Sequence, residues 1–335
     1  MGKRYDYNGL NEIPAKIDLK GNKLYVSGAS QVGPNKWELA TLSYHASDGT
    51  LLGEKRSVGN ATQGVNEIND LTIDDDGNIY LTGAIKNQNS FDIAIYKLDE
   101  NLNIIWEKQF DGYGNDDKGN GIKVDSQGNV YIAGTIQTNN EGKNYVLIKY
   151  AQNGDLLWYR EFNGKANLDD EATQLVLNND KIFITGLAKN TSLSSFQTLV
   201  YNKDGTLYTQ IEFKNPNLNE IPTGITVDLN GNIIVVGQTD LGNGKYRTRT
   251  VKYTLFEKPL EPVFENGEPK YNANELIIRF DRSAVKYDAI DRTSFTAGML
   301  SDFIQPNVIT KMSNKLGFDV SRLETFKIFR RMTTA

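Results

Sequence analysis

The sequence predicts an all-β chain whose main part is a five-bladed β-propeller, followed by a small α/β domain. A short run of alternating apolar residues that ends in glycine occurs five times, at intervals of 55, 51, 52 and 51 residues. The five glycines are Gly28, Gly83, Gly134, Gly186 and Gly237. Asn-Gly and Asp-Gly pairs separate further short apolar runs within each repeat. A repeat of this length with several short strands is typical of a propeller blade, which is one four-stranded sheet.

Composition agrees with this architecture and excludes several classes of protein. The 335 residues are 39% hydrophobic, enough for one large and one small domain. No run approaches the roughly 18 apolar residues that cross a bilayer, and residues 1–10 lack the apolar segment of a signal peptide. With no cysteine there is no disulfide, thiol catalysis or cysteine-based metal site, as suits an exported protein. The net charge of −5 argues against nucleic acid as a partner.

The third repeat shows the predicted strands most clearly. Alternating runs occupy residues 122–125, 130–136, 145–150 and 156–162, with turns that contain glycine between them. This period of two and these turns predict four antiparallel strands, from the innermost to the outermost of a blade. The same order returns from Leu71, Leu175 and Ile225.

The two ends of the repeat array predict how the ring closes. The last repeat reaches residues 250–253 and has no convincing fourth strand, whereas Lys3–Gly9 resembles residues 158–164, a fourth strand with its following loop. An N-terminal strand that completes the last blade would remove two open sheet edges. The sequence therefore predicts five blades closed by the N-terminal strand. The alternative is that the chain is part of a propeller with six or seven blades.

A fourth strand that ends in YNG or FNG, an acidic loop and the pattern IxVDxxGNxYxxG recur along residues 3–253. This pattern resembles the bacterial β-propeller repeats called SBBP. The resemblance implies an exported bacterial protein, secreted or at the cell surface, in which the propeller is an accessory module. It implies no catalytic activity.

After Tyr253 the repeat ends. Residues 254–274 hold three of the eight prolines and are predicted to be a linker. Residues 275–335, with 10 Lys or Arg and 7 Asp or Glu, predict a strand over 275–280, a helix near 301–305 or 308–315, and a second strand over 323–329. This segment resembles the prodomains of subtilisin-like peptidases. The resemblance implies that the chain is the non-catalytic N-terminal part of a precursor, with a peptidase domain downstream as a partner.

Acidic residues recur in the loop that leads into each repeat, 16 or 17 residues before its glycine. The selected positions are Glu12, Glu67, Asp117, Asp170 and Glu220. In a propeller these loops surround one mouth of the channel, so a ring of acids would hold a cation or a basic segment of a partner. The alternative, which we favour, is that the side chains brace the loops by bonding backbone N–H groups.

Aromatic residues form a second repeated set, near the start of the third strand of each repeat. They are Trp37, Phe91, Tyr145, Phe196 and Tyr246. Such side chains stack on sugars or anchor protein partners. Regular placement on strands favours packing between blades instead. Among the aromatic residues on strands, this third-strand set is the better candidate for exposure.

Candidates for catalysis and metal binding are few. The single histidine, His45, is predicted to end a third strand before the turn at Asp48 and Gly49, and no residues form a triad with it. Residues 74–78, Asp-Asp-Asp-Gly-Asn, resemble part of a calcium loop but lack its spaced ligands. The equivalent turns keep Gly-Asn while the acids vary, which favours hairpin geometry over Ca²⁺ as a cofactor.

These observations predict a non-catalytic propeller module that binds a protein or a glycan at the cell surface. The first alternative is a structural spacer or export accessory without a ligand, and the second is a glycan-binding propeller. A propeller hydrolase or lyase would need a base beside clustered acids in the channel, for which the sequence offers no candidate set.

Overall fold

The computed structural model describes residues 5–34, 36–57, 64–87, 89–190 and 192–254, and four short strands beyond them. The chain divides into two compact units, Met1–Leu255 and Phe256–Ala335. The first unit ends two residues after Tyr253, the predicted end of the propeller. Among the described residues, no helix is long and apolar enough to cross a membrane.

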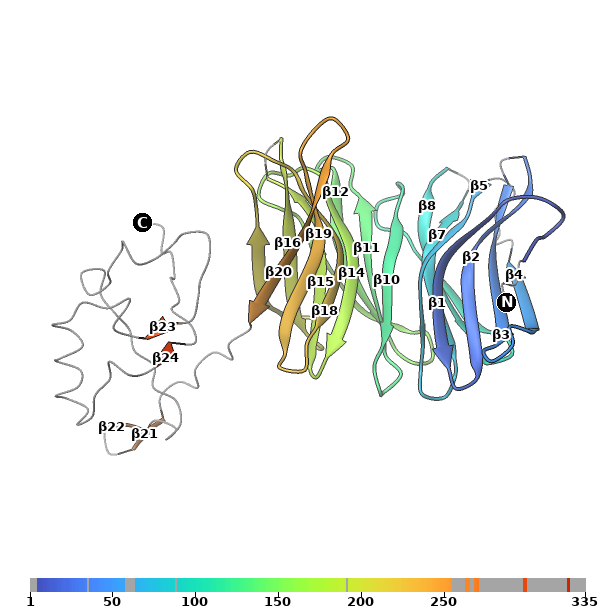
Figure 1. Cartoon of the computed structure of the whole chain (residues 1–335), viewed down its shortest axis with the longest axis horizontal. Coiled ribbons are helices and arrows are strands. Elements are labelled where there is room, and N and C mark those ends of the chain that lie inside the picture. Colours follow the sequence, from blue (N-terminus) through green and yellow to red (C-terminus); the bar gives the residue numbers. More distant parts are fainter. Residues whose placement is uncertain are drawn as a thin grey trace. The chain divides into compact units, whose positions relative to one another are not determined.

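The first unit contains five antiparallel sheets, one for each repeat (Figure 1). The first sheet has β1 (Glu12–Lys20), β2 (Lys23–Gly33), β3 (Lys36–His45) and β4 (Leu51–Ser57), with β5 (Gly64–Val65) parallel to β3. The second has β6 (Glu67–Ile73), β7 (Ile79–Lys86), β8 (Phe91–Leu98) and β9 (Ile104–Phe110). The third has β10 (Lys118–Val124), β11 (Val130–Gln137), β12 (Lys143–Tyr150) and β13 (Leu156–Phe162). The fourth has β14 (Asp170–Asn178), β15 (Lys181–Lys189), β16 (Ser194–Asn202) and β17 (Leu207–Phe213), and the last has β18 (Glu220–Val227), β19 (Asn232–Asp240) and β20 (Tyr246–Thr254).

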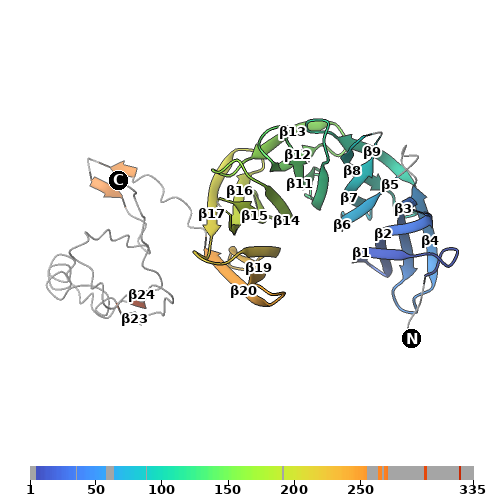
Figure 2. The same cartoon turned by 90° about the horizontal axis from the view of Figure 1, so that it is seen from above.

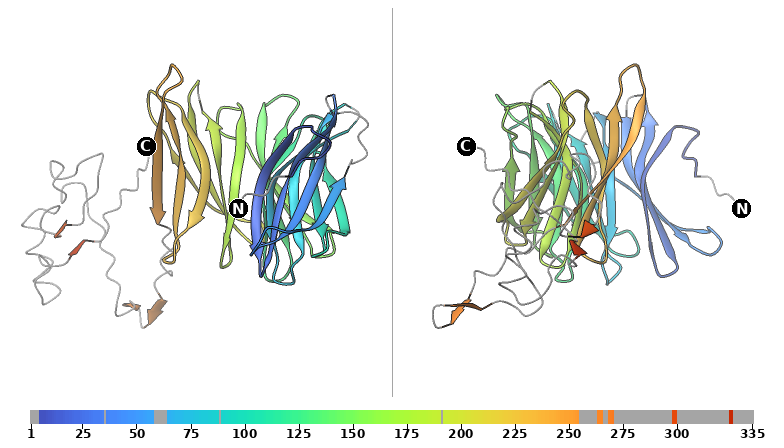
Figure 3. Two further views of the ribbon diagram at one scale, coloured as in Figure 1. Left: turned by 45° about the vertical axis from the view of Figure 1, so that its right-hand side comes forward. Right: turned by 60° about the vertical axis from the view of Figure 1, so that its left-hand side comes forward.

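Figure 2 shows the five sheets following one another along an open arc. The first strand of each sheet lies on the inside of the arc, and β4, β9, β13 and β17 lie on the outside. We call these the inner and outer strands. Within each sheet the strands run alternately up and down (Figure 3). The all-β propeller-like architecture and the four strands of the third repeat are therefore as predicted.

The repeated glycine is explained by a bulge in every inner strand. The pairing shifts register next to the glycine's partner in all five sheets, for example between Gly119 and Gly121 opposite Gly134. A Cβ added to Gly134 would lie 2.6 Å from the carbonyl oxygen of Lys118. The other four glycines would meet an inner-strand carbonyl in the same way. Only glycine lets the bulged strand approach so closely.

The apolar core lies between sheets. Four buried clusters each combine side chains of two successive sheets, and each contains an inner-strand residue of the later sheet. Leu71, Ile122 and Leu175 have this place in the first three clusters, where they are 1%, 0% and 1% exposed. Packing of one sheet's inner strand against the previous sheet thus fixes the order of the array.

The Gly-Asn turns have the predicted hairpin geometry. Gly77, Gly128 and Gly231 have φ angles of +86°, +77° and +77°, which favour glycine. In the turn at Gly128, the backbone N–H of Asn129 donates to Asp125 Oδ1 at 2.9 Å. The repeated Asp, Gly and Asn therefore form one turn.

The predicted closure of the ring stays a prediction. The last sheet has three strands, and in the described part of the chain no strand pairs with the free edge of β20. Residues 5–11 form no strand, and residues 1–4 lie outside the described ones. The segment does have the geometry of a loop after an outer strand. Tyr7 N donates to Glu12 Oε1 at 3.1 Å, just as Gly112 N donates to Asp117 Oδ2 at 2.6 Å.

The second unit shows only short strands. In the predicted linker, β21 (Val263–Glu265) pairs with β22 (Glu268–Lys270), and β23 (Gly298–Met299) pairs with β24 (Glu324–Thr325), which lies within the predicted strand 323–329. The predicted strand 275–280 and the predicted helix lie outside the described residues. The described part of this unit contains no helix, so it does not show the predicted α/β domain.

Candidate functional site

The loop acids of the third and fourth repeats are buried and accept hydrogen bonds from backbone N–H groups. Asp117 and Asp170 are 1% and 0% exposed. Asp117 accepts from Gly112 N at 2.6 Å in its loop and from Gln137 N at 3.0 Å at the end of β11. Asp170 joins its own loop to β15 in the same way, through the N–H groups of Gly164 and Lys189. Each carboxylate thus fixes a loop to the next sheet, which confirms the favoured alternative at these positions.

Burial also changes the acidity of both carboxyl groups. Removal from water raises the pKa of Asp117 to about 6, although its two backbone N–H donors lower it. The pKa of Asp170 is raised to about 6 by the same cause and opposed by the same kind of donors. A cation at the channel mouth requires accessible carboxylates, and these two are not exposed.

Glu67 does not belong to the same set. It pairs with Ala84, one residue after Gly83, whereas Asp170 pairs with Ala188, two residues after Gly186. The equivalent residue in the second repeat is Asn66, which is 1% exposed and accepts from Lys86 N at 2.9 Å. Glu67 instead forms a half-exposed ion pair with Lys118 at 2.9 Å. The shift arises in the hairpin turn. Gly28 and Gly186 follow their inner-strand partners Pro14 and Ala172 by 14 residues, whereas Gly83 follows Ile68 by 15, so a count of 16 residues before the glycine selects Glu67 instead of Asn66.

Glu12 and Glu220 occupy the equivalent positions in the first and last sheets, and both contact a hydroxyl group. Thr239 Oγ1 lies 2.9 Å from Glu220 Oε2, and Arg249 lies 3.6 Å from the other oxygen of this fully buried carboxylate. Ser30 lies 3.4 Å from Glu12. The five predicted acids therefore include four structural carboxylates and one surface ion pair. They do not present an open acidic ring.

The aromatic set divides by burial. Tyr145 and Phe196 are 1% and 0% exposed and belong to the clusters between sheets, so packing explains them as favoured. Trp37 and Phe91 are partly buried, and Lys86 Nζ lies 4.5 Å from the centre of the Phe91 ring. Tyr246 alone is largely exposed, at 54%. The structure does not bring the five rings together as one surface.

His45 and the aspartate turns also have structural roles. His45 ends β3 as predicted, and its ring nitrogens lie 2.8 Å from Ser47 Oγ and 2.8 Å from Asn22 Nδ2. The Asp74 carboxylate accepts hydrogen bonds from the side-chain amide of Asn78 and from the hydroxyl of Tyr80, the latter at 2.9 Å. Within the part of the chain that the structure describes, no group of three or more His, Cys, Asp or Glu residues has an arrangement suited to a metal.

The structure reveals a repeated exposed feature that the sequence analysis did not select. The outer strand of each of the first four sheets begins with a bulge, and the extra residue at that bulge is large and apolar. These residues are Leu52, Ile105, Leu157 and Tyr208, which are 49%, 51%, 49% and 36% exposed. We call them the outer belt. The signal in the sequence is an apolar pair directly after each turn before the outer strand, at residues 51–52, 104–105, 156–157 and 207–208.

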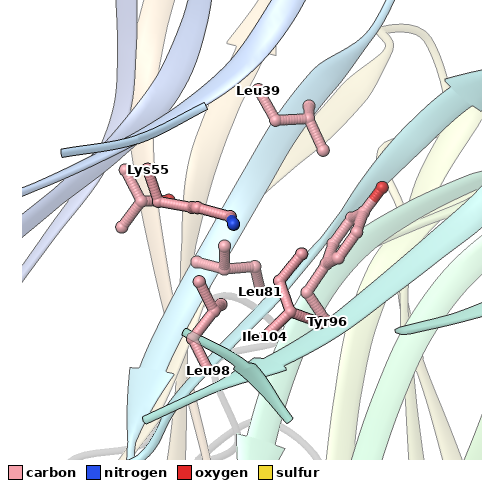
Figure 4. A pocket seen from close by; sticks show the side chains of 7 residues that line it. Leu39, Lys55, Leu81, Tyr96, Leu98 and Ile104 are labelled. Carbon is pink, nitrogen blue, oxygen red and sulfur yellow. The ribbon is translucent and has the colours of Figure 1, made fainter. Parts of the chain in front are cut away.

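A small cavity lies beside this belt, between the first two sheets (Figure 4). Leu39, Leu81, Leu98 and Ile104 surround it with Tyr96, and the amino group of Lys55 points toward it. Its volume of about 10 Å³ admits at most one water molecule. Ile104 lines the cavity and is 36% exposed, and its neighbour Ile105 is 51% exposed.

A family model described as a beta-propeller repeat, SBBP, matches residues 105–140. That match and the five sheets agree on the fold. A solved polysaccharide lyase of family PL25, an ulvan lyase, has 15% identity and a TM-score of 0.50, with 75% of this chain and 72% of that chain covered. A neuraminidase-like protein from A/bat/Guatemala/164/2009 has 12% identity, a TM-score of 0.47 and coverage of 71% of each chain.

The β-propeller domain of the Trilobed protease from Pyrococcus furiosus is also similar. It has 12% identity and a TM-score of 0.43, with 72% of this chain and 69% of that chain covered. No curated protein matches the sequence. At these identities the likeness concerns the fold alone, and proteins with this fold differ widely in activity.

Proposed function

We propose that the chain is a non-catalytic propeller module of an exported bacterial protein and that its outer belt binds a protein partner. The observation that carries this proposal is the exposure of Leu52, Ile105, Leu157 and Tyr208 at four equivalent bulges. Tyr246, the exposed member of the aromatic set, lies on β20 at the end of the array and is not part of the belt.

The bulge makes the apolar choice informative. The extra residue of a bulge takes no part in the regular backbone pairing of the sheet, so that pairing does not require it to be apolar. Exposed edge strands commonly carry charged residues that prevent association. Four apolar residues at such positions instead favour a surface that a partner covers. Covering one half-exposed leucine contributes on the order of 1 kcal/mol, so four such contacts would support specific binding.

The assigned roles of the other candidates support a module without catalysis. Asp117 and Asp170 bond backbone, Glu67 pairs with Lys118, and His45 contacts its own turn. The SBBP match supports the propeller fold. The expectation of an exported bacterial protein rests on the sequence resemblance alone. A peptidase domain downstream of this chain remains a partner that only the sequence resemblance suggests.

The test is binding of the full chain to surface-protein and polysaccharide fractions of the source cells, assayed separately. Replacement of all four outer-belt residues by serine should reduce protein binding at least tenfold with unchanged thermal unfolding. Leu229→Ser is the matched control because Leu229 is fully exposed on a turn outside the belt. Binding to the polysaccharide fraction would favour the glycan alternative. Equal binding by the belt variant would refute the belt, and no binding by the native chain would favour the spacer.

A further inference from the structure

The inner strand of the first sheet exposes large apolar side chains. Ile13, Ile17 and Leu19 on β1 are 56%, 57% and 54% exposed. Their backbone is paired with β2 as in the other sheets, so they belong to a regular strand. Such exposed apolar residues on a regular strand indicate a surface that packs against another element.

Equivalent positions in the other sheets show what packs against this face. Ile17 pairs with Val26, two residues before Gly28, and Leu71, Ile122 and Leu175 have the same relation to their own glycines. Those three residues are almost fully buried in clusters that also contain a tyrosine of the preceding sheet. The tyrosines are Tyr25, Tyr80 and Tyr131. The face of β1 at Ile17 is therefore built to pack against a sheet of the same kind.

The sheet of β18, β19 and β20, the last that the structure describes in the first unit, carries the matching face. Ile234 has the position of Tyr80 and Tyr131, three residues before the glycine of its repeat, and is partly exposed. Val236 and Tyr246 on the same sheet are 39% and 54% exposed. Lys252 pairs with Ile234, as Lys97 pairs with Tyr80 and Lys149 with Tyr131. The last sheet thus repeats the pattern of a sheet that receives an inner strand.

We propose that the last sheet of a second copy of this chain covers the β1 face, so that copies associate head to tail. In the structure the array is an open arc (Figure 2), and no apolar cluster joins the first and last sheets among the described residues. Closure within one chain would require a change in the packing between successive sheets. A second copy can dock without that change, because the interface it makes repeats those already present.

Polar contacts between inner strands define the expected register. The unpaired bulge residues Asn69, Asn120 and Thr173 each donate to an inner-strand carbonyl of the next sheet, at 2.8, 2.7 and 3.4 Å. The accepting residues are Gly119, Ala172 and Pro222. Thr223 is the bulge residue of the last sheet, and Pro14 has the position of the three acceptors. The proposal therefore places the hydroxyl of Thr223 against the carbonyl oxygen of Pro14 in the second copy.

The absence of cysteine allows a direct test by disulfide formation. A Cβ added to Gly121 would lie 3.1 Å from the backbone nitrogen of Leu175 in the next sheet. Gly224 and Ile17 have the equivalent positions at the two ends of the array. One full-length variant carries Gly224→Cys and another carries Ile17→Cys, and they are mixed under mild oxidation. Each variant alone is the control, because head-to-tail docking brings no two identical positions together.

Disulfide-linked dimers in the mixture, and little in either variant alone, support the proposal. If the disulfide forms only within a single chain that carries both substitutions, the array closes on itself and the proposal is wrong. Absence of both links in folded variants also overturns it. Sedimentation equilibrium gives a second readout without cysteine. Ile17→Asp should return the mass to that of one chain, whereas Leu229→Asp should not, and a native chain of single-chain mass would contradict the proposal.

Discussion

The buried carboxylates predict an unusual dependence of stability on pH. Asp117 and Asp170 have pKa values raised to about 6, against an ordinary value of 3.8, because burial disfavours the ionised form. A carboxyl group with a raised pKa in the folded state stabilises the fold fully below pH 3.8. That contribution is lost as the pH rises through 6. The difference between the two pKa values corresponds to about 3 kcal/mol at each position.

The perturbation is replacement of both residues by asparagine, which the second repeat already has at Asn66. Asparagine does not ionise, but it has one oxygen where Asp117 accepts through two, at a cost of about 1–3 kcal/mol. Between pH 4 and pH 7 the native chain loses about 2.5 kcal/mol at each position and the variant loses none. The stability of the variant relative to the native chain should therefore rise by about 5 kcal/mol over this range.

The assay is urea unfolding at pH 4, 5, 6 and 7, followed by the fluorescence of the three tryptophans. The reciprocal change, Asn66→Asp, is the matched control and should add a pH dependence of the same sign as the native aspartates. A stability difference between native chain and double variant that stays constant from pH 4 to pH 7 would refute the reasoning. It would mean that these carboxylates ionise in the fold as they do in water.

Three further outcomes test other parts of the structure. Gly134→Ala should lower the free energy of unfolding by about 1–3 kcal/mol. The control Gly33→Ala should change it by less than about 0.5 kcal/mol, because its added Cβ would meet only a side-chain carbon at 4.0 Å. Equal effects in urea unfolding would contradict the bulge explanation. Tyr145→Ala should cost about 3–5 kcal/mol and Tyr246→Ala almost nothing, and the reverse order would mean that burial is wrongly assigned. Asp228→Asn should destabilise most at neutral pH, because hydrogen bonds lower the Asp228 pKa, and the loss should shrink in acid; a loss that grows in acid would refute it.

The sequence predicted the periodic part of the fold well, because that part depends on local pattern. The alternation from Ile122 to Phe162 marks four strands, and the turn at Gly128 requires a positive φ. Both signals act over a few residues. The packing of Tyr145 and Phe196 between sheets followed from their regular spacing.

The sequence was less informative where register decides the outcome. Glu67 and Glu12 both lie 16 residues before a glycine, yet only Glu12 is equivalent to Asp117, because the hairpin from the inner-strand partner to the glycine spans 14 residues in the first repeat and 15 in the second and third. A fixed count of residues before the glycine does not detect the longer turn. The second repeat has Asn66 at the equivalent position, so a pattern of acidic residues points to its neighbour Glu67 instead.

In each of the first four repeats the two bulges place opposite demands on the chain, and this difference separates structure from function. At the inner bulge the strand approaches its neighbour so closely that Gly134 and its equivalents leave no choice of residue. At the outer bulge the side chain of Leu157 is half exposed, so many residues would fit. A residue type repeated where the fold requires it needs no further explanation. An apolar type repeated four times where the fold does not require it does, and the covering partner that we propose would supply that explanation.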